Sequence, residues 1–534
     1  MKMNDRNKSL CYLALPVLLL LAVSFIQPSL ASAQTTSSGV DCSNINVASL
    51  LKQDNLGAGR ILIECGIVRG GQPSAGGTVT EPPSPPNIRV SNGSACSSSS
   101  DVCGSESMVA GSTKDKGQTV VVNYNANYES SNYSGTSYSS DGGSTFTEIQ
   151  PAPFANGHGE NVGDPLVVFN TKLGMFFAGD LAGGCGGQGI GLWTSPDGKT
   201  WSTGACAHNG GEDDRPSMWA DNVGSSATFG RMFISFNDFT VGSGALEVVY
   251  SDDGTTWNGP VVVSNTSTFM RDVQITGSPR GAGGKQSTVF LASMDEGGGG
   301  NATRQNVMYN STDGGTTWTT VAMGSRFNPP GDGPCPSNGY FWQVNPIIRH
   351  MGWGEPAVGP NGVVHYVFAG AGTNGDTGDI FYTRSTNNGS TWSTPIKLNT
   401  DKDAQFKEQW MPSLSATSGG KITASWYDRR KATSSCVNVG DAGCNYERVG
   451  RQSTTNGATW EPSEITISTG IITQPSQNDP DVVGCYAGDY DYNTALNGPD
   501  NGGKPAAYVT WTDGRFSISG VPVQSVDFAK VPLP

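Results

Sequence analysis

Short apolar runs separated by turn-forming residues fill most of this chain and predict a protein made almost entirely of β-structure. Clear examples are PLVVFN and MFFAGD within 165–180, RMFISFND at 231–238, VVHYVFAG at 363–370 and KITASWYD at 421–428. These runs are rich in β-branched and aromatic residues and are bounded by Gly, Asn, Asp or Ser, a pattern typical of strands. The segments between them have essentially no helical periodicity.

A short polar motif occurs six times and divides the predicted strands into units. Residues 311–318 read STDGGTTW, and related strings begin at Ser139, Ser195, Ser251, Ser385 and Ser453. A motif that returns every 56 to 74 residues indicates an array of similar units. Ser and Asp accept hydrogen bonds from backbone N–H groups, and Gly adopts a positive φ, so each copy is predicted to be a tight turn between the last two strands of its unit. The closing Trp or Phe is expected to pack between units.

Four strands in each unit of roughly 60 residues are typical of a β-propeller blade. The end of the chain repeats the first strands of a unit at 489–496 and 506–513 but has no seventh copy of the motif. We therefore predict an all-β propeller of four-stranded antiparallel blades, with seven blades favoured and six as the alternative. The lone strand NIRVS at 87–91 would complete the seventh blade by pairing with the C-terminal strands, which removes two open edges.

The N-terminal region is predicted to lie outside the propeller, to which we assign residues 87–534. Residues 1–33 combine a basic start, an apolar stretch and an Ala-Ser-Ala ending, the features of a cleaved secretory signal. Residues 34–86 are rich in Ser, Gly and Pro, which indicates a linker, with one ordered patch expected between Cys42 and Cys65. The protein is therefore expected to be secreted, into the extracellular space or the periplasm.

Composition narrows the classes of function. A net charge of −14 disfavours binding to nucleic acid or to anionic membranes, both of which require clustered Lys and Arg. The cysteine spacing after the signal sequence favours five disulfides. The expected pairs are Cys42–Cys65, Cys96–Cys103, Cys185–Cys206, Cys436–Cys444 and Cys335–Cys485. Only four histidines and no CxxC motif are present, which argues against a zinc site or a Ser-His-Asp hydrolase.

Charged residues recur at one end of the predicted blades, where the first strands begin and the second strands finish. Acids near the starts of first strands include Asp164, Asp214 and Glu355. The arginines at this end are Arg215, Arg271, Arg429, Arg430 and Arg515. Propeller mouths often bind ligands, and guanidinium groups bind carboxylates in bidentate fashion, so we expect a site for an acidic sugar. The alternative is that the acids cap loops and pair with neighbouring arginines.

The long connection 321–354 is expected to lie over the same mouth. Its Trp342 and Trp353 would stack on sugar rings, or would pack a loop that is tied down through Cys335. No cofactor is required for such a site and no metal ligands are assigned, although a ring of carboxylates and carbonyls would also suit Ca²⁺.

The consensus Ser-x-Asp-x-Gly-x-Thr-Trp resembles the Asp-box, or bacterial neuraminidase repeat, of the sialidase superfamily, and the resemblance spans most of residues 105–530. It implies an exo-α-sialidase type of glycoside hydrolase with an arginine triad on the substrate carboxylate, a Tyr nucleophile activated by Glu, and an Asp acid/base. On this basis the nucleophile would be Tyr427, with Tyr490 and Tyr492 as alternatives. Its partner would be Glu355 or Glu408, and the acid would be Asp164 or Asp214.

One feature departs from that family: it usually has an Arg-Ile-Pro sequence before the first Asp-box, and residues 104–138 contain no arginine. Asp-boxes also occur in non-catalytic propellers. Two functions therefore stay open: a secreted sialidase-like exo-glycosidase acting on extracellular glycans, and a non-catalytic propeller that binds glycan or protein through its central funnel. Three arginines converging beside a Tyr–Glu hydrogen bond would favour catalysis, whereas arginines paired with Asp428 and Asp513 would favour binding.

Overall fold

The computed structural model describes residues 40–71, 79–80, 87–91, 104–129, 132–149, 157–266, 268–278, 288–336, 338–345, 348–438 and 441–534. The predicted signal sequence, Cys96 and Cys103 lie outside the described residues. Contacts divide the chain into two compact units, Met1–Ile45 and Asn46–Pro534. Every helix and strand of the described residues belongs to the second unit. None of these helices is both long and apolar enough to span a bilayer.

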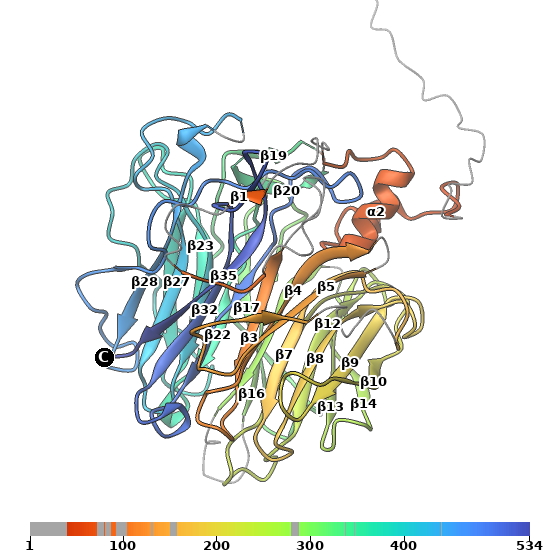
Figure 1. The fold of residues 1–534 in the computed structure, drawn as a ribbon, viewed down its shortest axis with the longest axis vertical. Helices are drawn as coiled ribbons and strands as arrows, with labels where there is room; N and C mark the ends of the chain where they lie inside the picture. Colours follow the sequence, from red (N-terminus) through yellow and green to blue (C-terminus); the bar gives the residue numbers. More distant parts are fainter. Residues whose placement is uncertain are drawn as a thin grey trace, which may run out of the picture. The chain divides into compact units, whose positions relative to one another are not determined.

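The second unit consists mainly of antiparallel sheets, as the alternating apolar runs predict (Figure 1). Among the described residues, seven sheets contain four or more strands. The first sheet contains β3 (Ser105–Gly111), β4 (Val120–Glu129), β5 (Asn132–Ser139) and β6 (Thr147–Glu148), and the second contains β7 (Leu166–Asn170), β8 (Met175–Ala182), β9 (Gly189–Ser195) and β10 (Ser202–His208). The third contains β11 (Asp213–Ala220), β12 (Met232–Asp238), β13 (Ala245–Ser251) and β14 (Asn258–Ser264). The fourth contains β15 (Met270–Gly277), β16 (Val289–Asp295), β17 (Gln305–Ser311) and β18 (Thr319–Ala322).

The remaining three large sheets follow the same plan. The fifth sheet contains β22 (Glu355–Val358), β23 (Val364–Gly370), β24 (Asp379–Ser385) and β25 (Ile396–Lys397). The sixth contains β26 (Gln409–Ala416), β27 (Ile422–Asp428), β28 (Glu447–Ser453) and β29 (Ile465–Thr466). The seventh contains β31 (Thr494–Leu496), β32 (Ala506–Asp513), β35 (Ser525–Pro532) and β2 (Ile88–Arg89). The predicted pairing of the lone N-terminal strand is confirmed, because β2 lies antiparallel to β35 with Ile88 opposite Phe528.

Smaller elements complete the second unit. They include the helices α1 (Val47–Leu50) and α2 (Leu56–Glu64) and the 3₁₀ turns Pro360–Gly362, Ala442–Cys444 and Pro499–Asn501. One small sheet contains β1 (Val79–Thr80), β33 (Ser517–Ile518) and β34 (Val521–Pro522), and another contains β19 (Gly333–Cys335), β20 (Asn338–Asn345) and β21 (Ile348–Arg349). The short strand β30 (Asp491–Tyr492) pairs with β3 in parallel. The ordered patch expected between Cys42 and Cys65 is thus present as two helices.

The six copies of the polar motif form the turns between the third and fourth strands of their sheets, as predicted. In the copy at 251–257, the Gly254 N–H donates to Ser251 Oγ at 2.8 Å, and Asp253 Oδ1 accepts two further backbone N–H groups at 2.8 and 2.7 Å. These bonds lower the pKa of Asp253. Where Thr455 replaces Asp, its Oγ1 accepts the Thr459 N–H at 2.9 Å, so the substitution keeps the turn.

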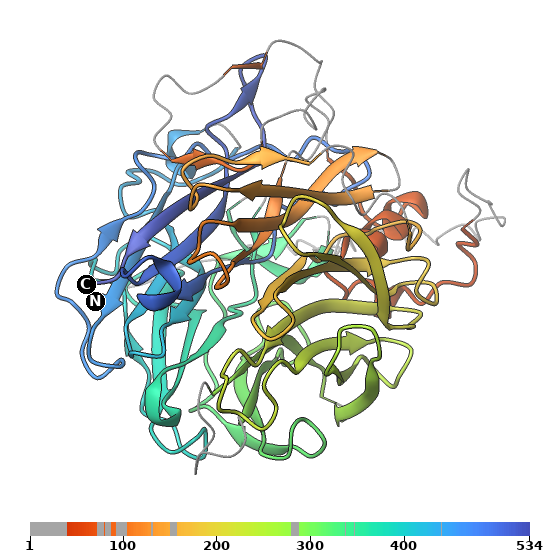
Figure 2. The ribbon, with the colours of Figure 1, turned by 60° about the horizontal axis from the view of Figure 1, so that its bottom comes forward.

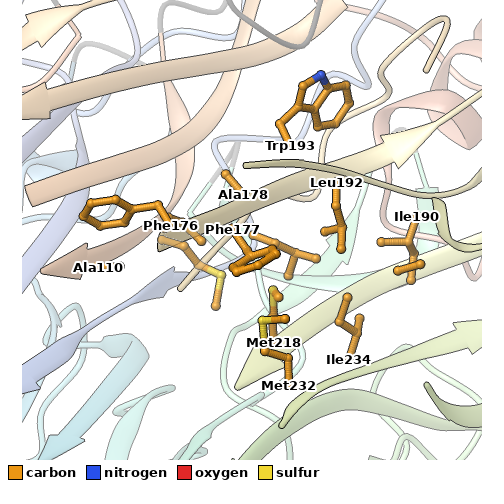
Figure 3. Close-up of a cluster of buried hydrophobic side chains, with 14 of the residues drawn as sticks. Ala110, Phe176, Phe177, Ala178, Ile190, Leu192, Trp193, Met218, Met232 and Ile234 are labelled. Atoms are coloured by element: carbon orange, nitrogen blue, oxygen red, sulfur yellow. The ribbon is translucent and has the colours of Figure 1, made fainter. Parts of the chain in front are cut away.

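Hydrophobic side chains fill the space between neighbouring sheets. Figure 3 shows one such cluster, in which Phe177 and Leu192 of one sheet meet Met218 and Ile234 of the next, all at most 4% exposed. Burial of each such side chain contributes about 1.5–3 kcal/mol. The closing aromatic of the motif takes part in this packing, since the Trp257 side chain lies against the same cluster.

The first strands of the seven large sheets contact one another in chain order, and Figure 2 shows the sheets in that succession. The contacts are β3–β7, β7–β11, β11–β15, β15–β22, β22–β26, β26–β31 and β31–β3. A cavity of about 630 Å³ is lined by residues of all seven of these strands, including Val167, Met218 and Leu414. The start of each first strand therefore lies near one end of a shared central space.

Three of the predicted disulfides are confirmed, namely Cys185–Cys206, Cys335–Cys485 and Cys436–Cys444. Cys42 and Cys65 are each disulfide-bonded as well.

Candidate anion-binding site

The same backbone irregularity occurs near the starts of four first strands. Glu106, Arg215, Asp272 and Met411 each have a positive φ, between 42° and 63°, and each lies at a register shift near the start of a first strand. Such values are uncommon for residues other than Gly, and a bulge of this kind turns a side chain away from the regular alternation of the strand. Asp164, just before β7, also has a positive φ, of 62°.

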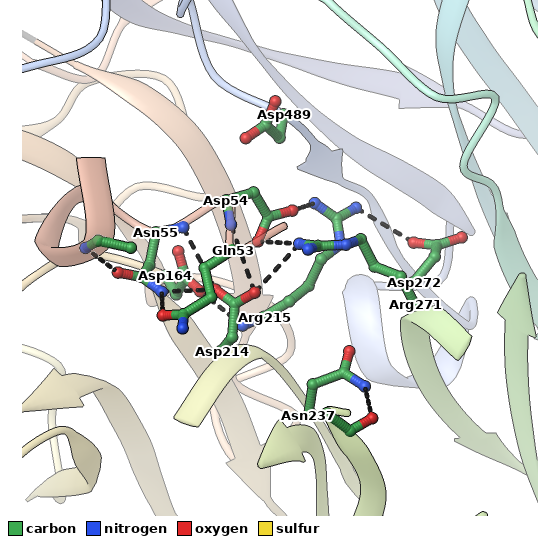
Figure 4. A network of polar contacts seen from close by, with 12 residues as sticks. Gln53, Asp54, Asn55, Asp164, Asp214, Arg215, Asn237, Arg271, Asp272 and Asp489 are labelled. Carbon is green, nitrogen blue, oxygen red and sulfur yellow. Dashed lines mark hydrogen bonds and ion pairs between the residues drawn. The ribbon is translucent and has the colours of Figure 1, made fainter. Parts of the chain in front are cut away.

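Three arginines contact one residue, Asp54, and Figure 4 shows two of them, Arg215 and Arg271, beside its carboxylate. Arg215 Nη1 lies 3.2 Å from Asp54 Oδ2, and Arg271 Nη1 lies 2.8 Å from Asp54 Oδ1. Arg349 Nη2 donates to the backbone carbonyl of Asp54 at 2.7 Å. The three arginines and Asp54 are at most 3% exposed, so the cluster is closed to solvent. We call Arg215, Arg271 and Arg349 the arginine cluster.

Asp54 comes from the N-terminal segment that was predicted to be a linker. It lies between α1 and α2, next to Asn55, whose side chain caps α2 by accepting the Ala58 N–H at 2.8 Å. The Asn55 side chain also donates to Asp214 Oδ1 at 2.7 Å, which ties the segment to the start of β11. Capping fixes the direction of α2, and the charge pairing then holds the Asp54 carboxylate against the arginines.

The electrostatics separate the acids of the site into two kinds. Burial raises the pKa of Asp54, but the arginine cluster outweighs burial and the pKa is lowered, so Asp54 is ionised. Burial raises the pKa of Asp164 well above its usual range, and the neighbouring carboxyl groups of Glu106 and Asp214 raise it further. Burial and Asp54 likewise raise the pKa of Asp214. The ionised carboxylate of Asp54 thus lies with Asp164 and Asp214, whose carboxyl groups favour the protonated form.

A Tyr–Glu hydrogen bond lies beside the arginines. The Tyr340 hydroxyl donates to Glu296 at 2.6 Å, and the same carboxylate lies 3.6 Å from Arg271 Nε. Trp353 donates from Nε1 to Glu296 at 2.7 Å, and its ring centroid lies 4.3 Å from the Arg215 guanidinium carbon. Burial and the Glu296 charge raise the pKa of Tyr340 well above its usual range, so this hydroxyl is a hydrogen-bond donor at neutral pH.

Four residues predicted from the repeat pattern, Asp164, Asp214, Arg215 and Arg271, lie together in the site. Trp353, predicted from the long connection 321–354, lies beside them. Sequence reasoning missed Asp54, Arg349 and Glu296, and it placed Tyr340 over the mouth only as an aromatic that could stack on sugar rings. Tyr492, one alternative nucleophile, accepts a hydrogen bond from Arg215 Nη2 at 3.3 Å, and Tyr490, the other, stacks on Tyr492 with ring centroids 4.6 Å apart.

The predicted pairing of Tyr427 with Glu355 or Glu408 is not formed. The Tyr427 hydroxyl donates to Asp491 and accepts the Thr512 N–H at 2.8 Å. Glu355 instead accepts the Leu414 N–H at 2.6 Å and the Ser413 hydroxyl.

Three of the predicted arginines pair with acids elsewhere instead of joining the cluster. Arg429 pairs with Glu408 at 3.0 Å. Arg430 pairs with Asp428 and Glu464, and Arg515 with Asp513 and Asp527. Trp342 is half-buried in β20, where its backbone N–H donates to Met351 Sδ at 3.4 Å.

A metal ion is not needed to balance the charge here. Carboxylate oxygens of Asp54, Asp164 and Asp214 lie within 4.8 Å of one another, the kind of grouping that can hold a cation. The arginine cluster already supplies positive charge to Asp54 and Asp214.

Comparison with known proteins gives distant structural likenesses. No family model matches the chain, and no curated protein sequence matches it. A protein of unknown function from Dyadobacter fermentans is 13% identical over 85% of this chain and 99% of its own, with a TM-score of 0.42. An ulvan lyase is 11% identical over 86% of this chain and 94% of its own, with a TM-score of 0.43. An α-L-arabinofuranosidase from Fusarium graminearum is 13% identical over 65% of this chain and 92% of its own, with a TM-score of 0.40. At such scores the likenesses assign no activity to this chain.

Proposed function

We propose that this protein is a secreted, glycan-active β-propeller of seven blades whose arginine cluster binds the carboxylate of an acidic sugar. The observation that carries the proposal is that Arg215 and Arg271 both bind the carboxylate of Asp54, while Arg349 binds the backbone carbonyl of the same residue. Guanidinium groups that hold an internal carboxylate have the geometry and charge to hold an external one. The chain of contacts among seven first strands supports the blade count, and the disulfides support secretion.

Asp54 occupies the proposed ligand position, so an external carboxylate must displace it. The matched test therefore compares the wild type with Asp54→Ala by calorimetric titration, using methyl glycosides of N-acetylneuraminic acid and glucuronic acid and, as a neutral sugar, methyl galactoside. Asp54→Ala is expected to bind one of the acidic sugars at least about tenfold more tightly than the wild type, a gain of about 1.4 kcal/mol, because Asp54 no longer competes for the arginines. The neutral sugar should not bind.

A second substitution identifies the binding group. Arg271→Gln added to Asp54→Ala is expected to abolish binding of the acidic sugar, whereas Arg326→Gln should not change it. Arg326 is the matched control because it pairs with Asp295 in a partly exposed ion pair outside the cluster. Equal binding of acidic and neutral sugars, or binding that survives Arg271→Gln, would contradict the proposal.

The Tyr340–Glu296 hydrogen bond beside Arg271 favours a second candidate function, exo-glycosidase activity of the sialidase type. In that function the Tyr340 oxygen would attack the anomeric carbon and pass its proton to Glu296, while the glycosidic bond breaks and Asp164 or Asp214 protonates the departing oxygen. Water would then hydrolyse the glycosyl–tyrosine bond and restore the phenol. Hydrolysis of fluorogenic sialosides or glucuronides by wild type or Asp54→Ala, lost in Tyr340→Phe with sugar binding retained, would establish it. An absence of hydrolysis across the panel would leave binding as the function.

A further inference from the structure

A second group of polar side chains lies between two neighbouring sheets, away from the arginine cluster. His208 ends β10, Asp213 begins β11, Asp238 ends β12 and Glu247 lies within β13. One ligand atom from each of His208, Asp238 and Glu247 lies within 4.8 Å of the others. The imidazole comes from one sheet and both carboxylates come from the next, so the group bridges the two sheets.

The imidazole is held in one orientation. His208 Nδ1 lies 2.7 Å from Asp213 Oδ2, and the ring centroid lies 4.6 Å from that of Phe236. A hydrogen bond from Nδ1–H to a carboxylate fixes the tautomer in which Nε2 carries the free lone pair. This carboxylate–imidazole pairing is the usual support of a metal-binding histidine.

The carboxylates of this group have only part of the partners that buried charges need. Glu247 is 2% exposed and Asp213 is fully buried, and within the described residues Glu247 Oε2 and Asp213 Oδ1 have no hydrogen-bond partner. Asp238 accepts the Thr240 N–H at 2.7 Å and the Thr240 hydroxyl at 2.5 Å, both through Oδ1. No Lys or Arg among the described residues forms an ion pair with these three acids. Buried carboxylates are found paired or bound to a metal, because an unpaired charge in the interior is costly.

We propose that His208, Asp238 and Glu247 bind a divalent transition-metal ion, for which Zn²⁺ is the best fit, and that Asp213 orients His208. One imidazole and two carboxylates are a ligand set that Zn²⁺ accepts, with a fourth position left for water. The ion balances the two negative charges. Since the His208 side chain is 12% exposed, the group has an edge at the surface through which an ion can enter.

The test uses the purified full-length protein, stripped with a chelator and dialysed against Zn²⁺. Elemental analysis is expected to find one Zn²⁺ per chain in the wild type and none in Glu247→Gln or His208→Asn. Asp295→Asn is the matched control, because Asp295 ends β16, as Asp238 ends β12, yet pairs with Arg326 at 2.6 Å. This control should retain the ion.

Two further measurements keep the test decisive if a variant folds poorly. Co²⁺ added to the stripped wild type should give the visible absorption of a low-symmetry site with one nitrogen ligand. Asp213→Asn should bind Zn²⁺ about 10–100-fold more weakly while still binding one ion, as expected for a residue that orients a ligand. A wild type that holds no stoichiometric metal, or a Glu247→Gln variant that holds as much as the wild type, would overturn the proposal.

Discussion

Replacing Glu355 by Gln should change how the stability of the protein depends on pH. Glu355 begins β22 beside the central cavity and is 9% exposed. Burial raises its pKa to about 8, against the hydrogen bonds from Ser413 and Leu414, which favour the charged form. A folded-state pKa above the unfolded value means that the contribution to stability is complete below about pH 4 and is lost as pH rises to about 8.

The size of this loss follows from the two pKa values. In the unfolded chain Glu355 ionises near its ordinary value of 4.5, whereas in the folded protein it keeps its proton until about pH 8. At about 1.4 kcal/mol for each pH unit, the free energy of unfolding falls by roughly 4 kcal/mol between pH 5 and 8 on account of this residue alone. Gln keeps an oxygen that can accept the Leu414 N–H but cannot ionise.

Urea unfolding at pH 5, 6, 7 and 8 measures the effect. The advantage of the wild type over Glu355→Gln should shrink by roughly 4 kcal/mol across this range. Glu461→Gln, at an exposed position, is the control and should give a profile parallel to that of the wild type. Parallel profiles for wild type and Glu355→Gln would refute the reasoning, since they would mean that Glu355 is already ionised at pH 5.

Two further predictions concern the fold. Gly254→Ala should lower the free energy of unfolding by about 2–4 kcal/mol, because the residue has φ of +75° and its new Cβ would lie 2.3 Å from the Phe177 ring. Gly174→Ala, with φ of +66° and nothing within 4 Å, should cost only about 1 kcal/mol, and equal losses in urea unfolding would disprove the contact argument. Tyr427→Phe should lower the free energy of unfolding by about 1–3 kcal/mol in the same assay, because Asp491 loses a hydrogen-bond donor. Added to Asp54→Ala, the same substitution should leave the binding of the acidic sugar unchanged.

The fold was largely predictable because its signals are local and repeated. Strand runs and turn motifs recur in each unit along the chain, so an error in one unit is corrected by the others. The same repetition identified Asp164, Asp214, Arg215 and Arg271, which lie at or just before the starts of first strands. The bulge at these positions cannot be predicted from residue type, because it occurs both at Glu106 and at Arg215.

The outer arginines were misassigned because sequence position does not reveal the direction of a side chain. The strings WYDRR at 426–430 and WTDGR at 511–515 end the second strands of two sheets. In both, the Trp Nε1 and the Arg two residues after Asp bind that Asp. A Trp-x-Asp-x-Arg string at the same place in two units is therefore the signal of a local structural device.

The role of the N-terminal segment could not be predicted, because it depends on a match between one carboxylate and arginines that come from different parts of the chain. Asn55 before an apolar run indicates a capped helix, yet nothing local says that the preceding Asp54 meets Arg271 and Arg215. This arrangement has a consequence for binding. If only a fraction of molecules has Asp54 displaced, the apparent affinity for an acidic ligand is the intrinsic affinity reduced by that fraction. The ratio of affinities between Asp54→Ala and wild type would then measure how rarely the site opens.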